Sequence, residues 1–404
     1  MAIAAAARSL REAWCISIGH GLTHWYPATF YLLLPLIGRE LGLSYSQIGF
    51  IMTCQYAASA LFNIPGGLIV DLSGRKALLM AVSLFWIGVP YVLMGFAHQY
   101  WIILVCVVLI GIGNNLWHPA AISLLGAHYP ERRGLVLSLH SMGGNIGDAF
   151  APLLVGALLA TLTWRTIVFI NVVPGVAAAI AILMFSGVMI GAARPTVAAH
   201  SEAHLAEAVR LRLKGLAALL RDRSVLMISL GSAFRTMTQN ALVTFLPLYL
   251  SYDMGYSAAR VGAAMFGLQV AGFIAAPIAG HLADRMGNQR IVASSMVMTA
   301  IVIVAMVMAA HSPAFVALIA LLGFFLYAVR SIMQAWLLDV VPESMAGTSV
   351  GVPFGAQSLG SAIGPLLCGV VADRWGLMAA FWALAASIVV ANLFVFLTPR
   401  APSR

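Results

Sequence analysis

Ionisable side chains interrupt apolar stretches of this chain that are long enough to hide them from water. Two of them are arginines, Arg235 and Arg330, and one is an aspartate, Asp148. Arginine stays charged in proteins, and its planar guanidinium suits a carboxylate or a phosphate. Because Asp148 can neutralise only one arginine, we expect the other to bind an anionic small molecule. The alternative is that an arginine pairs with Asp148 or with backbone carbonyls and serves only to hold the structure together.

Asp148 is also the natural proton carrier, because the protonation of a buried carboxylate changes when its surroundings change. We expect it to carry or gate a proton together with His20 and His24. The alternative for each histidine is a neutral, hydrogen-bonded packing role. With His118, the pair of histidines could also form a transition-metal site. No carboxylate or thiolate stands beside them at a fitting spacing, so we expect no metal site and no cofactor.

Helical spacing extends two of these positions into polar faces. Tyr327, Arg330 and Gln334 recur at intervals of three and four residues, as do Arg235 and Gln239 with their serine and threonine neighbours. Residues three or four apart lie on one side of a helix. The side chains expected to bind the substrate are therefore Arg235, Arg330, His24, His118, Asn115, Gln239, Tyr327 and Gln334.

The composition shows which elements must position these residues. Of the 404 residues, 62% are hydrophobic and only 9% are charged, against about 25% charged in an ordinary soluble domain. This excludes a soluble enzyme, a disordered protein and a nucleic-acid-binding module, and it predicts an all-α integral membrane protein. The apolar runs predict twelve membrane-spanning helices, at about 13–37, 44–70, 77–97, 101–127, 134–161, 164–190, 225–250, 256–283, 289–310, 313–340, 346–371 and 376–397.

The basic residues predict the orientation. With both termini in the cytoplasm, 16 Lys and Arg residues lie on the cytoplasmic side and 4 on the opposite side. Cytoplasmic loops carry an excess of Lys and Arg. The net charge of +9 is therefore a signal of topology, and no polyanionic partner is needed to explain it.

The chain contains an internal duplication. A polar stretch at 191–224 divides it into six-helix halves at 1–190 and 225–404, which repeat at an offset of 212 or 213 residues. Gly67, Asp71 and Gly74 recur in this way as Gly280, Asp284 and Gly287. Repeated halves with a site between them are the architecture of a secondary transporter that works by alternating access.

The motif from Gly67 to Lys76, with twelve spans and a long central loop, resembles the major facilitator superfamily. The resemblance implies two pseudo-symmetric six-helix bundles around a central cavity. An aspartate at a helix end can accept bonds from a facing helix terminus or from a nearby arginine, which would latch one conformation. The expected gate residues are Gly67, Asp71, Gly74, Arg75, Gly280, Asp284 and Arg285. The alternative is a plain basic loop that sets the topology.

A closer resemblance lies in two glycine-containing segments. Gly111 to Pro119, which includes Trp117 and His118, and Gly143 to Gly147 resemble the fosmidomycin-resistance-type efflux proteins. That resemblance implies proton-driven export of a phosphonate-like or drug-like compound. Alanine and valine replace two glycines of the superfamily's antiporter motif, at Ala151 and Val155, so the direction stays open.

These observations predict a monomeric secondary transporter in the cell's inner membrane, which exports a small organic anion in exchange for protons. The alternative is proton-coupled uptake of an organic acid. A transition-metal transporter, a membrane receptor, a channel and a membrane-embedded enzyme are more distant alternatives. The sequence has no H-E-x-x-H, no G-x-S-x-G and no G-x-x-x-x-G-K-[ST] motif, so we expect neither an enzyme nor an ATP-driven pump.

Overall fold

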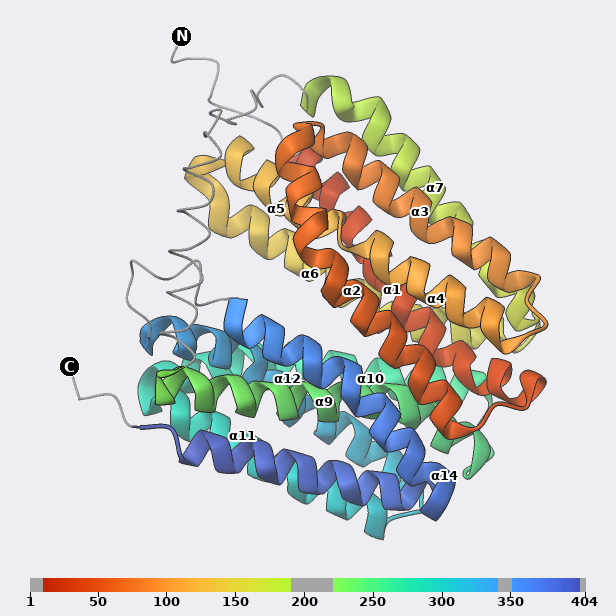
Figure 1. Cartoon of the computed structure of the whole chain (residues 1–404), viewed down its shortest axis with the longest axis vertical. Coiled ribbons are helices and arrows are strands. Elements are labelled where there is room, and N and C mark those ends of the chain that lie inside the picture. The colour runs from red at the N-terminus through yellow and green to blue at the C-terminus, as the bar shows by residue number, and fades with distance from the viewer. Residues whose placement is uncertain (1–9, 190–220, 341–350, 400–404) are drawn as a thin grey trace. The chain divides into compact units, whose positions relative to one another are not determined.

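The computed structural model describes residues 10–189, 221–340 and 351–399, and all regular structure in these ranges is helical (Figure 1). The helices of the N-terminal part are α1 (Arg11–Leu41), α2 (Tyr45–Ser73), α3 (Lys76–Gly95), α4 (Tyr100–Asn114), α5 (Trp117–His128), the short 3-10 helix η1 (Pro130–Arg132), α6 (Arg133–Leu158) and α7 (Trp164–Met189). Those of the C-terminal part are α9 (Arg223–Tyr252), α10 (Ala258–Met286), α11 (Asn288–Met308), α12 (Ala314–Val340) and α14 (Gly351–Phe396).

The predicted all-α fold is confirmed, with two differences in how the spans are cut. The span predicted at 101–127 is broken after Asn114 and continues as α5. Pro119 has no backbone N–H to donate to the carbonyl four residues earlier, so the helix is interrupted just before it. The spans predicted at 346–371 and 376–397 follow one another within α14, where Gly376 departs from helical geometry with φ of 83°. Glycine tolerates this positive φ, which marks the turn between the two spans.

Hydropathy separates the helices into two groups. Seven helical stretches of the described residues are long and apolar enough to cross a membrane by length and composition. The long helices outside this group are α1, α2, α6 and α9. Three of them, α1, α6 and α9, carry the predicted polar residues His20, Asp148 and Arg235. Polar side chains lower the hydropathy of a helix, which accounts for these three helices, whereas Arg330 and His118 lie on helices of the apolar group.

The described helices form two compact units. The first contains the described residues of Met1–Leu33 and Ala58–Thr196, and the second those of Leu34–Ala57 and Val197–Arg404. Most of the segment 191–224, predicted as a cytoplasmic loop, lies outside the described residues. The predicted boundaries at 190 and 225 stay predictions.

Matching backbone geometry supports the internal duplication. Gly42 and Gly255 both have a positive φ, 61° and 65°, after the helices α1 and α9. Gly74 and Gly287 do the same after α2 and α10. Prolines inside helices also recur at the duplication offset, as Pro65 with Pro277 and Pro152 with Pro365.

In the first unit, glycines bring α1 and α6 into backbone contact. A Cβ on Gly143 would collide with the carbonyl oxygen of Ser17, and one on Gly147 would collide with that of Gly21. Small residues permit this close approach of helices in membranes. The fully buried Trp117 packs its ring against Gly19, which holds the start of α5 beside α1.

The second unit repeats this packing. Helix α9 packs along α14, and α10 packs along α12. A Cβ on Gly360 would collide with the carbonyl oxygen of Ala233, and one on Gly364 would collide with Met237. Both units thus position their polar residues on helices whose backbones are held close together by glycine.

Candidate functional site

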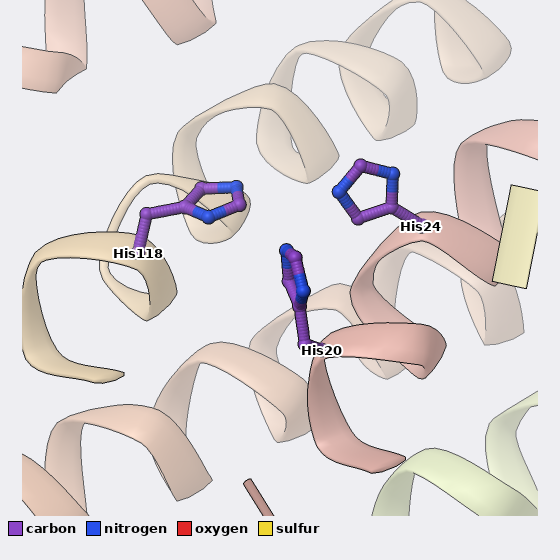
Figure 2. Close-up of side chains that lie close together, drawn as sticks. All are labelled: His20, His24 and His118. Carbon is purple, nitrogen blue, oxygen red and sulfur yellow. The ribbon is translucent and has the colours of Figure 1, made fainter. Parts of the chain in front are cut away.

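The first unit gathers four histidines around one point. His20 and His24 come from neighbouring turns of α1, and His118 comes from α5 (Figure 2). The ring centroids of His20 lie 4.7 Å from His24 and 5.1 Å from His118. His140 of α6 stacks on His20 at 3.8 Å. The structure therefore brings together the three histidines of the possible metal site, with His140 beside them.

Two oxygens hold this cluster in place. The Nδ1 atom of His24 lies 2.9 Å from Oδ2 of Asp148, and the side chains are 28% and 32% exposed. The Nδ1 atom of His20 lies 2.6 Å from the backbone carbonyl oxygen of His140. Asp148 therefore pairs with an imidazole of its own unit. The proton-coupling role predicted for Asp148, His20 and His24 stays a prediction.

The local sequence explains why these rings meet. A Cβ on Gly144 would lie 2.8 Å from Cε1 of His20 and 3.1 Å from Cδ2 of His24, so glycine gives both rings room at this position. The packing of Trp117 on Gly19 brings the next residue, His118, to the same side of α1. The glycines at 143, 144 and 147, which carry the closer family resemblance, therefore have a packing role.

Asn115 has a different setting from the histidines. It lies in the interruption between α4 and α5, and its Nδ2 atom donates to Oγ of Ser59 and to the carbonyl oxygen of Gly111, each at 2.8 Å. These bonds join α2 to the break in the neighbouring span. The amide thus stabilises the break, and the substrate-binding role predicted for it stays a prediction.

The second unit buries Arg235, which is only 2% exposed. Its Nη1 atom donates to Oε1 of Gln239 at 2.6 Å and, more weakly, to the carbonyl oxygen of Leu326 at 3.4 Å. Its Nη2 atom donates to Oγ1 of Thr236 at 3.0 Å. All three acceptors are neutral, and Nε has no hydrogen-bond partner among the described residues. The positive charge of Arg235 is thus held in place without being neutralised by a carboxylate in the part of the chain that the structure describes.

The other residues predicted to bind substrate in this unit lie around Arg235 or on α12. Arg330 is exposed, and its positive charge interacts unfavourably with that of Arg235. Tyr327 contributes to the electrostatic environment of Arg235 and packs against Gly272. Gln334 is half-buried on the same helix. The structure thus brings Arg235, Gln239 and α12 together within this unit, whereas His24, His118 and Asn115 belong to the other unit.

The predicted gate residues lie at the ends of α2 and α10. Gly74 has a φ of 62°, and the backbone N–H of Arg75 donates to Oγ of Ser73. Asp284 and Arg285 are exposed near the end of α10. The side chain of Asp71 lies outside what the structure describes. The latch role of these loops stays a prediction.

A carboxylate bound to a helix terminus does occur, at a residue that the sequence analysis missed. Asp373 accepts hydrogen bonds from the backbone N–H groups of Tyr45 at 2.8 Å and Ser46 at 2.9 Å, and from the hydroxyl of Ser46. These are the first residues of α2. The sequence did carry a signal, because Gly369, Asp373 and Gly376 repeat the spacing of Gly67, Asp71 and Gly74.

Comparison with known proteins agrees with this architecture. The family model described as the Major Facilitator Superfamily matches residues 14–268 and 228–404. A phosphoglycerate transporter protein of Salmonella typhimurium is 25% identical over 92% of this chain and 84% of its own length. The multidrug resistance protein MdtG of Proteus mirabilis is 24% identical over 96% of this chain and 95% of its own length.

A solved structure shows the same fold. A bacterial homologue of the human lysosomal transporter Spinster superposes with a TM-score of 0.82 at 16% identity, over 97% of both chains. The family match and the transporter relatives show that this chain is a multi-pass membrane transport protein and not an enzyme. The closer likeness to fosmidomycin-resistance-type proteins stays a prediction. By its sequence match and its fold, the chain belongs to the Major Facilitator Superfamily.

Proposed function

We propose that this protein is a secondary transporter that exports a small organic anion in exchange for protons, and that Arg235 binds the anion. The observation that carries the proposal is the buried guanidinium of Arg235, whose three hydrogen-bond acceptors are neutral. A buried charge without a counter-ion costs several kcal/mol. Hydrogen bonds to a charged group each return about 1.5–3 kcal/mol. The neutral partners thus hold Arg235 in position when the site is empty, and an anion supplies the missing negative charge.

The geometry of Arg235 suits a carboxylate or a phosphate. Nε is unpartnered among the described residues, and Nη2 has one described acceptor for its two hydrogens. These two nitrogens form one edge of the guanidinium, which binds two oxygens of a carboxylate or phosphate in a fork. Arg330 adds a second positive charge to the same unit. The phosphoglycerate transporter relative favours an anionic substrate, and the multidrug resistance relative supports retaining a drug-like anion among the probes.

The remaining assignments of the proposal come from the sequence. The excess of Lys and Arg on one side supports an orientation with both termini in the cytoplasm, and the bacterial transporter relatives support a bacterial inner membrane. We take the transporter to be a monomer. Export is the proposed direction, and uptake of the anion together with a proton is the alternative.

The proposal is tested with purified protein in liposomes that contain a pH-sensitive dye. The probes are phosphoglycerate, fosmidomycin and a panel of short organic acids, added separately to wild type and to Arg235→Gln. We expect a probe-dependent pH change in wild type that is lost in Arg235→Gln. The sign of the change separates exchange with protons from transport in the same direction.

Arg260→Gln is the matched control, because Arg260 is an exposed arginine of the same unit that lies over the ring of Tyr256. It is expected to transport like wild type. Transport of an anion by Arg235→Gln with unchanged KM would refute the substrate site. Anion transport without any pH change would refute the coupling to protons and leave the substrate site standing.

A further inference from the structure

The histidine cluster of the first unit has a geometry that the proposed anion site does not use. One ring nitrogen each of His20, His24 and His118 lies within 4.8 Å of the other two. The three rings approach a common space from α1 and α5, as Figure 2 shows. The sequence favours no metal at this place because no carboxylate stands at a fitting spacing. In the fold, however, the carboxylate of Asp148 from α6 lies beside His24. The lack of a carboxylate near these histidines in the sequence therefore no longer argues against a metal site.

Hydrogen bonds fix which nitrogen of each ring can bind a ligand. The carbonyl oxygen of His140 can only accept, so Nδ1 of His20 carries the hydrogen and Nε2 of the neutral ring keeps its lone pair. The same reasoning applies to His24, whose Nδ1 faces the carboxylate of Asp148. Nε2 of His20 is buried and has no hydrogen-bond partner among the described residues. A buried acceptor without a donor is costly, and a metal ion is a partner that would satisfy it.

This pattern is the one that metal-binding histidines show. A histidine that binds a metal usually donates its other ring N–H to a carboxylate or to a backbone carbonyl, which orients the ring. His24 donates to the carboxylate of Asp148, and His20 donates to the carbonyl of His140. Both outer partners are therefore already in place around two of the three rings.

The dimensions of the cluster fit a small ion after a short movement. With metal–nitrogen distances of about 2.0–2.1 Å, three nitrogens around a tetrahedral ion lie roughly 3.3 Å apart. The described nitrogens, within 4.8 Å of one another, reach that spacing if each moves by roughly 1 Å.

The donor set decides the class of metal. Imidazole nitrogen suits Zn²⁺, Cu²⁺ and Ni²⁺, whereas Mg²⁺ and Ca²⁺ prefer oxygen ligands. The negative charge of Asp148, next to His24, would offset part of the charge of a divalent ion. We propose that His20, His24 and His118 bind a late first-row divalent metal ion of the Zn²⁺ type, and that Asp148 and the carbonyl of His140 orient the rings.

The test measures metal binding in the absence of transport. Untagged, full-length protein in detergent is stripped of metal and dialysed against ZnCl₂, and bound zinc is counted per chain. Wild type is expected to bind one Zn²⁺. His24→Asn and His118→Asn each remove one ligand and are expected to weaken binding by roughly a hundredfold or more. Asp148→Asn is expected to weaken it about 10- to 100-fold, and Asp148→Glu is expected to recover part of that loss.

The chain offers a matched control in His128. Like His24, it has its Nδ1 atom beside a carboxylate, that of Glu12 at 2.7 Å, but it is not part of the cluster. His128→Asn should bind zinc as wild type does. The absorption of Co²⁺ in place of Zn²⁺ gives a second readout, because three nitrogen ligands around a tetrahedral ion produce strong visible bands that a loosely bound surface ion lacks.

Two results would overturn the proposal. One is wild-type protein that retains no zinc on dialysis, a result that does not depend on any variant folding. The other is zinc binding that His24→Asn and His118→Asn leave unchanged, which would assign the ion to another place. Either result leaves the anion site standing, because transport is not part of this measurement.

Discussion

The two units differ in how they treat a buried polar group. In the first unit, the groups are imidazoles, and the carboxylate of Asp148 lies within hydrogen-bond distance of one of them. In the second unit, Arg235 carries a permanent charge, and its hydrogen-bond acceptors among the described residues are all neutral. A histidine can be neutral, so its cluster can persist without a partner from outside. Arginine cannot, so the second unit gains most from an anionic ligand. The contrast predicts opposite changes in the stability of the protein when Arg235 and Asp148 are each replaced by an apolar residue.

The largest effect is expected from Arg235→Met. Replacing a buried charge by an apolar side chain of similar length removes the desolvation cost and the repulsion from Arg330. In the absence of substrate we expect the variant to be more stable by about 1–4 kcal/mol, and we expect transport of organic anions to be lost. Thermal unfolding at a fixed scan rate and uptake into liposomes check the two parts. A variant that is less stable than wild type would show that Arg235 is a structural residue.

A second test concerns the close contact between α1, which carries His20 and His24, and α6, which carries Asp148. Gly147→Ala places a Cβ against the carbonyl oxygen of Gly21, and the helices must separate. We expect a loss of about 1–3 kcal/mol of stability, as for other overpacked positions.

Gly126→Ala is the control for this variant, because a Cβ on Gly126 meets nothing within 4 Å. Gly126 lies in the last turn of α5, so this change is expected to alter stability by less than the roughly 0.5–1 kcal/mol that Gly to Ala gains in the middle of a helix. Equal thermal stability of the two alanine variants would contradict the close packing of α1 and α6.

Asp148→Ala should lower the stability of the protein, whereas Arg235→Met should raise it. It leaves Nδ1 of His24 without its acceptor, and the cost of an unpaired donor is about 1–3 kcal/mol when it is fully buried. Because both side chains are partly exposed, we expect a loss near the lower limit, at about 1 kcal/mol. Thermal unfolding measures it, and Asp148→Asn, which keeps an acceptor oxygen, should lose less. An increase in stability would remove the contrast between the two units.

The smallest expected effect on stability comes from a comparison of Asp373 and Asp284, which lie in two copies of the same glycine–aspartate spacing. Asp373→Ala removes the acceptor for two backbone N–H groups at the start of α2, and loss of such a cap costs about 1 kcal/mol. Asp284→Ala changes an exposed side chain and is expected to stay within about 0.5 kcal/mol of wild type. Thermal unfolding of both variants checks the difference. A reversed order would mean that the loop after α10 has the stabilising contact.

The sequence predicts the helices and their duplication because both depend on local patterns. Hydropathy sets the spans, and the positive φ values of Gly42 and Gly255 occur at the turns that the repeat predicts. The pairing of His24 with Asp148 could not be predicted, because these residues are 124 positions apart and lie on helices that meet only through tertiary packing. Two of the three acceptors of Arg235, Thr236 and Gln239, lie within four residues of it on the same helix, whereas the contact with Leu326, 91 positions away, depends on tertiary packing. Pro119 was a visible signal for the break after α4. The spacing around Asp373 marked another copy of the glycine–aspartate pattern, but its contact with the start of α2, 327 and 328 positions away, depends on tertiary packing.

The central claim is that Arg235 binds the transported anion, and exchange of labelled substrate tests it most directly. Liposomes that contain wild-type protein and unlabelled phosphoglycerate or another anion identified in the dye assay are diluted into a trace of the same labelled anion, with no ion gradient present. The account predicts rapid entry of label with wild type and with Arg260→Gln, and none with Arg235→Gln. Entry of label through Arg235→Gln at the wild-type rate and KM would contradict it.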